Sequence, residues 1–220
     1  MGCRQANGCP MSTSRRIFLT TSGAFLAFPA AGPALAQDAM SAELAKEGPL
    51  GDVVTGKADA KVTVIEYASL TCSHCATFHE KTYPALKAKY VDTGKVKFIF
   101  REFPLDPLAT AGFMLARCGD KAKFSPMIEL LFQQQKNWAF VDKPVTALVN
   151  IVKQAGFTQE SFDACLKRDD IYAAVNDVKN RAAEKLGVNS TPTFFINGQK
   201  HTGAFTIEEL DKILAPLVGG

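Results

Sequence analysis

The chain has 220 residues, of which 47% are hydrophobic and 21% charged, with 25 Lys and Arg against 22 Asp and Glu. These proportions are ordinary for a globular protein, and the length allows one domain with a real core or one domain with a large insertion. The formal net charge of +3 comes from Arg4, Arg15 and Arg16, because no acidic residue precedes Gln37. The rest of the chain is neutral, so its overall charge gives no reason to expect nucleic-acid binding.

Residues 1–36 have the pattern of an export signal. The run Ser14–Leu19 (Ser-Arg-Arg-Ile-Phe-Leu) resembles the twin-arginine motif, with the general secretory route as the alternative. A modestly apolar stretch follows over residues 20–35, and its two glycines and two prolines argue against a transmembrane anchor. Ala34-Leu35-Ala36 has the small-x-small form of a cleavage site, so we expect cleavage after Ala36 and export to the periplasm without a stable membrane anchor. Met11 is a second candidate for the start of translation.

Residues 37–56 form a polar lead-in, for which the sequence predicts a short helix and then a loop that runs to Asp59. Residues 62–69 are rich in β-branched and aromatic side chains and predict a strand. A helix is expected from the residues after Cys72 to Tyr83, where Pro84 kinks or ends it. The elements that follow are a helical continuation to Tyr90, a turn at 92–94 and a strand over 95–103.

The most informative motif is Cys72-Ser73-His74-Cys75, because it lies between the predicted strand and the predicted helix. At this junction the unsatisfied N–H groups and the dipole of the helix favour a thiolate at Cys72. A thiolate attacks disulfides and a thiol does not, so the placement indicates thiol–disulfide exchange. The alternative is half of a zinc site, but a structural site usually has a second ligand pair at matching spacing. Cys118 and Cys165 stand alone in the sequence, so no metal is expected.

Removal of the signal would leave four of the six cysteines, Cys72, Cys75, Cys118 and Cys165. Four cysteines in an oxidising compartment allow three pairings. We expect Cys72 to pair with Cys75 and Cys118 with Cys165, with two free buried cysteines as the alternative for the second pair. A disulfide between Cys118 and Cys165 would stabilise the fold by roughly 4 kcal/mol on the chain-entropy model.

Residues 106–186 contain no convincing strand. Thr158 is a plausible N-cap there, with Glu160 in the first turn of its helix. A hairpin is expected after Gly187, because Asn197-Gly198 has the type I′ turn signal. A capping box at Thr206 opens a last helix to about Leu217. The helices predicted in the block are 109–118, 123–134, 144–155, 158–167 and 171–186, and the hairpin strands are 194–196 and 199–202.

This order of elements resembles the DsbA family of exported disulfide oxidoreductases, in which a helical domain is inserted into a thioredoxin fold. Four local features carry the resemblance over residues 48–218: the Cys-Ser-His-Cys motif, Glu66 six residues before Cys72, the Thr191-Pro192 loop before a strand, and Gly203 followed by the last helix. The resemblance implies an α/β thioredoxin fold with an all-helical insertion. It divides the chain into the signal (1–36), the lead-in (37–56), a first thioredoxin part (57–105), the insertion (106–186) and a second thioredoxin part (187–220).

The resemblance also implies roles for individual residues. Cys72 and Cys75 are the catalytic pair, and His74 between them favours the reduced state and so makes the pair oxidising. Glu66 occupies the buried acidic position from which a carboxylate could relay protons to Cys75. The Thr191–Pro192 bond is expected to be cis, with the Thr191 backbone binding an extended peptide by strand addition. Members differ in having a second disulfide, here Cys118–Cys165, and His79 and His201 are expected to be surface or packing residues.

The expected function is that of a monomeric periplasmic thiol:disulfide oxidase that donates the Cys72–Cys75 disulfide to exported proteins. A membrane quinone reductase of the DsbB type would reoxidise it, and no cofactor beyond the disulfide is implied. A disulfide isomerase or reductase is an alternative, although residues 37–59 are too few for the dimerisation domain that those enzymes usually carry. A peptide-binding chaperone module with an inert dithiol is a third hypothesis.

Overall fold

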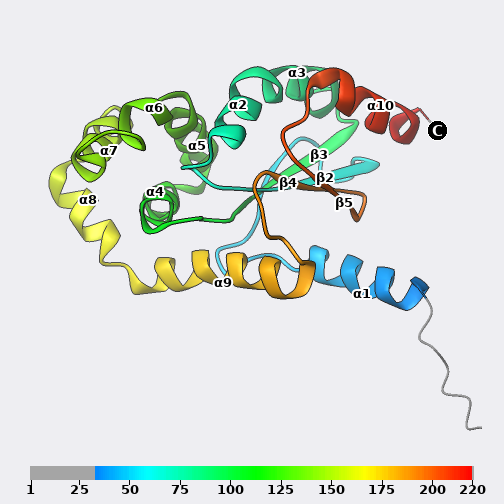
Figure 1. The fold of residues 1–220 in the computed structure, drawn as a ribbon, viewed down its shortest axis with the longest axis horizontal. Coiled ribbons are helices and arrows are strands. Elements are labelled where there is room, and N and C mark those ends of the chain that lie inside the picture. Colours follow the sequence, from blue (N-terminus) through cyan, green and yellow to red (C-terminus); the bar gives the residue numbers. More distant parts are fainter. Residues whose placement is uncertain (1–32, 220) are drawn as a thin grey trace, which may run out of the picture.

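The computed structural model describes residues 33–219. Their five strands form one mixed sheet in the order β1-β3-β2-β4-β5 (Figure 1). The central strands β2 and β3 run parallel, and every other neighbouring pair is antiparallel. The predicted export signal lies outside these residues except for its last four, which open helix α1. The strands are β1 Val53–Thr55, β2 Val62–Ala68, β3 Val96–Glu102, β4 Thr193–Ile196 and β5 Gln199–Thr202.

Helices cover both faces of the sheet and extend beyond one end of it. Helices α2, α3 and α10 lie on one face, whereas α1 and α9 lie along the other, and α4 to α8 gather at one end (Figure 1). Among the described residues, no helix combines the length and the apolar character that crossing a bilayer requires. The helices are α1 Pro33–Ala45, α2 Ser73–Lys81, α3 Tyr83–Leu86, α4 Pro107–Cys118, α5 Phe124–Gln133, α6 Gln135–Trp138, α7 Pro144–Lys153, α8 Gln159–Leu166, α9 Asp169–Leu186 and α10 Ile207–Val218, with a π-helical turn at Lys87–Val91 and a 3-10 turn at Lys121–Lys123.

Strand β2 is buried on both of its faces, which explains why its sequence is almost continuously apolar. Val62 and Val64 belong to the larger core under α2, whereas Ile65 and Tyr67 belong to a second core shared with α1 and α9. By the alternation of the strand, Glu66 points to the same side as Val64, beneath the helix that carries the cysteines. The sheet thus brings the predicted acidic residue to the face where the dithiol lies.

The lead-in differs from its prediction. Residues 53–55 form β1 and pair with β3, so the prediction of a loop there is wrong. A three-residue edge strand has too few residues for a recognisable alternation, and its hydrogen bonds to β3 are what hold it. A second difference is α6, a short helix after α5 that spans Asn137, where the sequence predicts a break.

The lead-in is tied to the sheet by a buried arginine. Arg101 on β3 is 1% exposed, and its guanidinium donates to both carboxylate oxygens of Asp52, at 3.0 and 2.7 Å. It also donates to the hydroxyl of Tyr67 at 2.9 Å and to the carbonyl of Leu44 at 2.9 Å. Every side of this buried charge therefore meets an acceptor, as burial of an ion requires.

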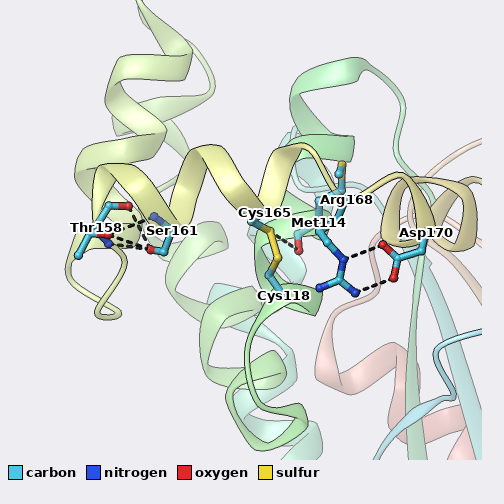
Figure 2. Close-up of a disulfide and its surroundings, with 7 residues drawn as sticks. All are labelled: Met114, Cys118, Thr158, Ser161, Cys165, Arg168 and Asp170. Atoms are coloured by element: carbon cyan, nitrogen blue, oxygen red, sulfur yellow. Dashed lines mark hydrogen bonds and ion pairs between the residues drawn. A yellow bond between two sulfur atoms is a disulfide. The ribbon is translucent and has the colours of Figure 1, made fainter.

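Residues 106–186 hold helices α4 to α9 and no strand. The structure joins Cys118, at the end of α4, to Cys165 on α8 in a disulfide (Figure 2). Thr158 caps α8, as the sequence predicts, and its partner in the capping box is Ser161. The insertion is thus closed on itself by one covalent link that joins its first helix to a later one.

The last part of the chain agrees with its prediction. Strands β4 and β5 form the hairpin, with Asn197 at φ 46° and Gly198 at φ 84° in the turn. Both central residues therefore have the positive φ that a type I′ turn needs. Thr206 and Glu209 form the capping box of α10.

Candidate active site

Cys72 is the residue that immediately precedes α2, so its sulfur lies at the amino end of that helix. A tight turn brings it there, because the Cys72 N–H donates to the carbonyl of Ser69, just after β2, at 3.1 Å. Cys75 follows within the first turn of α2 and is fully buried, whereas Cys72 keeps 9% of its surface exposed. Both are free thiols, so the structure shows the dithiol state of the motif.

The pKa of the Cys72 thiol is lowered to about 5. The largest cause is a hydrogen bond from the Cys75 thiol, which outweighs the opposing effect of burial. The Thr191 side chain and the main-chain N–H groups of Cys75 and His74 favour the thiolate further. Cys72 is therefore a thiolate at neutral pH and a good leaving group in disulfide exchange.

The pKa of the Cys75 thiol is raised well above its ordinary value. Burial is the main cause, and the hydrogen bond that Cys75 gives to Cys72 and the negative charge of Glu66 act in the same direction. The two sulfurs of one motif thus have opposite preferences: Cys72, which keeps a small exposed fraction, favours the charged form, and the fully buried Cys75 favours the neutral form.

The Thr191–Pro192 loop lies against the reactive sulfur. The bond between these residues is cis, and the Cys72 sulfur lies 3.3 Å from the carbonyl oxygen of Thr191, to which it donates when it is protonated. Pro192 is buried, while Thr191 remains partly exposed. The structure therefore brings the loop to the dithiol, although Thr191 and Cys72 are 119 residues apart in the sequence.

Glu66 is fully buried and pairs with His79, whose Nε2 lies 2.8 Å from Oε2 of the carboxylate. His79 lies on α2 one turn after Cys75, and its side chain is 5% exposed. The sequence predicts a surface or packing role for His79; the ring does pack, stacked on Phe132 with centroids 4.4 Å apart, but its pairing with Glu66 was missed. Only its spacing of four residues from Cys75 could have signalled a position on the same helix face.

Comparisons with known proteins agree with this geometry. A protein-family model described as "Thioredoxin" matches residues 50–215. A "Putative protein-disulfide oxidoreductase" of Rickettsia conorii is 36% identical over 160 residues, which are 72% of this chain and 57% of that protein. The "Probable disulfide bond formation protein D" of Bacillus cereus is 33% identical over 154 residues, 65% of this chain and 68% of the relative. The crystal structure of Wolbachia pipientis alpha-DsbA1 superposes with a TM-score of 0.74 at 32% identity, over 81% of this chain and 96% of the other.

The chain belongs to the DsbA family of thioredoxin-fold proteins. Its α/β architecture is the one expected, a thioredoxin fold with a helical insertion. The chain spans less than two thirds of the length of the Rickettsia relatives that it matches.

The DsbA-type insertion contributes a residue to the site that no sequence pattern predicts. Gln135 on α6 is 3% exposed, and its side-chain amide donates to the carbonyls of Leu70 and Cys72, at 2.8 and 3.0 Å. These bonds hold the turn that presents Cys72, because both carbonyls belong to the connection between β2 and α2. Gln135 stands within a run of three glutamines, so nothing local distinguishes it.

The other two histidines of this DsbA-family chain, His74 and His201, lie in different parts of the fold. His74 is exposed between the two cysteines, where its main-chain N–H favours the Cys72 thiolate. His201 lies on β5, with the centroid of its ring 6.1 Å from that of Phe205. Within residues 33–219 no three His, Cys, Asp or Glu side chains are grouped as metal ligands.

The lowered pKa of Cys72 makes the stability of the reduced protein depend on pH. The folded value, about 5, lies below the roughly 8.5 of an unfolded cysteine. The resulting stabilisation is complete above the unfolded value and is lost as the pH falls through the folded one. Cys75, whose pKa is raised, stays protonated throughout this range and adds nothing to it.

We therefore expect the Tm of the reduced protein, relative to the disulfide form, to fall as the buffer is taken from about pH 7 to about pH 4. The ultraviolet absorbance of the thiolate should titrate with a midpoint near pH 5 in the reduced protein. This absorbance step should vanish in a Cys72→Ser variant, which retains Cys75. A midpoint at the value of an ordinary cysteine would contradict the prediction.

Proposed function

We propose that this protein is a periplasmic thiol:disulfide oxidoreductase that donates the Cys72–Cys75 disulfide to exported proteins. The observation that carries the proposal is the opposite shift of the two thiol pKa values within one motif, beside the Thr191–Pro192 loop that contacts Cys72. Stabilising Cys72 as a thiolate stabilises the reduced form of the enzyme. When the reduced form of a cysteine pair is stable, its disulfide form is a strong oxidant. The family membership and the names of the relatives support the same chemistry.

The first step is the attack of a substrate thiolate on the Cys72 sulfur of the disulfide. A bond forms between the substrate sulfur and Cys72, the Cys72–Cys75 bond breaks, and Cys75 leaves with the electron pair. Because the pKa of Cys75 is raised, this sulfur takes up a proton. Glu66, whose charge contributes to that raised pKa, is the buried carboxylate through which the proton would pass to this sulfur.

The second step releases the product. A second substrate thiolate attacks the substrate sulfur of the mixed disulfide, and Cys72 leaves as the thiolate that its surroundings stabilise. The substrate has then lost two electrons and the enzyme has gained them, with no cofactor. An extended substrate segment would pair with the backbone of Thr191, next to the sulfur that it must reach.

The rest of the cycle and its location belong to the same proposal. The twin-arginine pattern and the cleavage pattern at Ala36 support export, and four remaining cysteines suit an oxidising compartment. Reoxidation requires an electron acceptor for the dithiol, for which we propose a membrane quinone reductase of the DsbB type. The protein would act as a monomer, because the dithiol, its loop and its buried acid all come from one chain.

The test is the refolding of ribonuclease from two starting states. The disulfide form of the protein should oxidise reduced ribonuclease, with one Cys72–Cys75 disulfide consumed for each disulfide formed, and should rescue scrambled ribonuclease poorly. The matched control is the same protein reduced beforehand and given no oxidant, which should form no disulfides. Rescue of the scrambled substrate alone would overturn the oxidase in favour of an isomerase.

A further inference from the structure

Two polar atoms of the Glu66–His79 pair are buried without a hydrogen-bond partner among the described residues. They are Oε1 of Glu66 and Nδ1 of His79, the outer atoms of the pair that is joined through Oε2 and Nε2. Leaving such atoms unsatisfied costs stability, and an apolar pair of similar volume would avoid the cost. A proton relay, by contrast, needs a free hydrogen-bonding atom at each end of such a pair, so that a proton can be passed on from either end.

Aromatic rings hold the imidazole of His79 in place. It stacks on Phe132 with an interplanar angle of 19°, and the edges of Phe78 and Phe100 meet it at 83° and 71°. The ring is therefore held with its Nε2 at Glu66, and almost none of the side chain lies on the protein surface. The same apolar wall keeps bulk water from reaching Glu66 directly, since Glu66 is 0% exposed.

His79 also lines a groove of about 220 Å³ on the surface between α2, α3 and α5. The ionisable groups around the groove are Glu80 on α2, Tyr83 on α3, Lys87 on the π-helical turn and Glu129 on α5. Burial raises the pKa of Tyr83 to about 12, so its phenol keeps its proton. His79 thus stands between Glu66, which faces the dithiol side, and a groove where charged side chains meet water.

The proposed reaction needs such a path twice in each cycle. Cys75 must take up a proton when it leaves the disulfide, and must lose it before it attacks a mixed disulfide during reoxidation. Cys75 is 0% exposed, so water cannot exchange this proton with it directly. Imidazole can take up and release a proton near neutral pH, which suits it to pass protons on in both directions.

We propose that His79 relays protons between Glu66 and the groove at Glu80 and Glu129, and thereby sets how fast Cys75 gains and loses its proton; this rests on the proposed function. In substrate oxidation a proton passes from His79 through the Glu66 carboxylate to the Cys75 sulfur, and water in the groove returns a proton to His79. Reoxidation reverses each transfer. Only protons move along this path, and the electrons remain with the sulfur atoms. His79 acts on Cys75 through Glu66 and not by contact with a sulfur.

The experiment follows one step, the attack of Cys75 on a glutathione mixed disulfide held at Cys72. Rapid quenching with acid and mass spectrometry measure the rate between about pH 5 and pH 8, where imidazole changes charge. His79→Gln keeps an amide donor for Glu66 but cannot relay a proton. We expect it to be about tenfold slower near neutral pH, a smaller effect than the roughly 100- to 10,000-fold of groups that transfer the proton directly, and to lose part of the pH dependence. Its redox equilibrium with glutathione should stay that of the wild type.

Two further variants separate a relay from a structural role. Free imidazole should restore the rate of a His79→Ala variant toward that of the wild type, and His201→Gln should behave as the wild type throughout. A His79→Gln protein whose rate and pH profile match those of the wild type would overturn the relay and leave the oxidase intact. A wild-type protein that forms no mixed disulfide at Cys72 would overturn the proposed function itself.

Discussion

A Cys72→Ser variant is expected to oxidise reduced ribonuclease no faster than the uncatalysed background. Serine cannot form the disulfide that is donated, and its hydroxyl is not ionised at neutral pH as the Cys72 thiol is. The loss should be complete because every electron that the substrate gives up passes through this sulfur. The measurement is the appearance of active ribonuclease after the variant and the wild type are treated with the same oxidant.

Two other variants sharpen this result. Cys75→Ala should accumulate a covalent complex with substrate at Cys72 when it is given a substrate disulfide, because no neighbouring thiol remains to release it. A protein without the second disulfide, Cys118→Ala/Cys165→Ala, should keep the activity, since that link lies in the insertion. Full activity of the Cys72→Ser variant would instead support a peptide-binding chaperone with an inert dithiol.

Arg101→Met should lower the free energy of unfolding by about 3–5 kcal/mol, the range for removing one partner of a buried ion pair. The change leaves the carboxylate of Asp52 buried at 8% exposure without its cation. It also removes the donor for the carbonyl of Leu44 and for the hydroxyl of Tyr67. Urea denaturation of the disulfide form measures the effect without a contribution from the titration of Cys72.

The matched control is Arg168→Ala, which breaks an ion pair with Asp170 whose two side chains are 53% and 60% exposed. An exposed pair of this kind contributes about 0–1 kcal/mol, so little change is expected. A double variant, Arg101→Met/Asp52→Leu, should recover much of the lost stability, because it removes the buried charge together with its partner. Equal effects of Arg101→Met and Arg168→Ala would contradict the importance of the buried pair.

The candidate catalytic motif was predictable from the sequence because its signals are local. The strand, the cysteines and the helix follow one another directly, and the amino end of a helix favours a thiolate in any fold. The hairpin turn at Asn197-Gly198 and the caps at Thr158 and Thr206 were predictable for the same reason. In each case the residues that interact lie within a few positions of one another.

Contacts between distant segments were not predictable in this way. The strand β1 exists because β3 pairs with it, and α6 carries Gln135 to the turn of Cys72 across 63 residues of sequence. The pairing of Arg101 with Asp52 also joins two elements that no local pattern relates. Each of these contacts forms only when folding brings the two distant segments together, so neither segment alone indicates it.

The sequence by itself therefore determined the motif on which the proposed chemistry rests, a Cys-x-x-Cys at the amino end of a helix, together with the family fold that surrounds it. Only the tertiary structure decided how the two sulfurs differ, since the burial of Cys75, the contact of Cys72 with Thr191 and the pairing of Glu66 with His79 arise from packing. Burial and charge act through space, so the protonation of each group depends on neighbours that the chain brings together only when it folds.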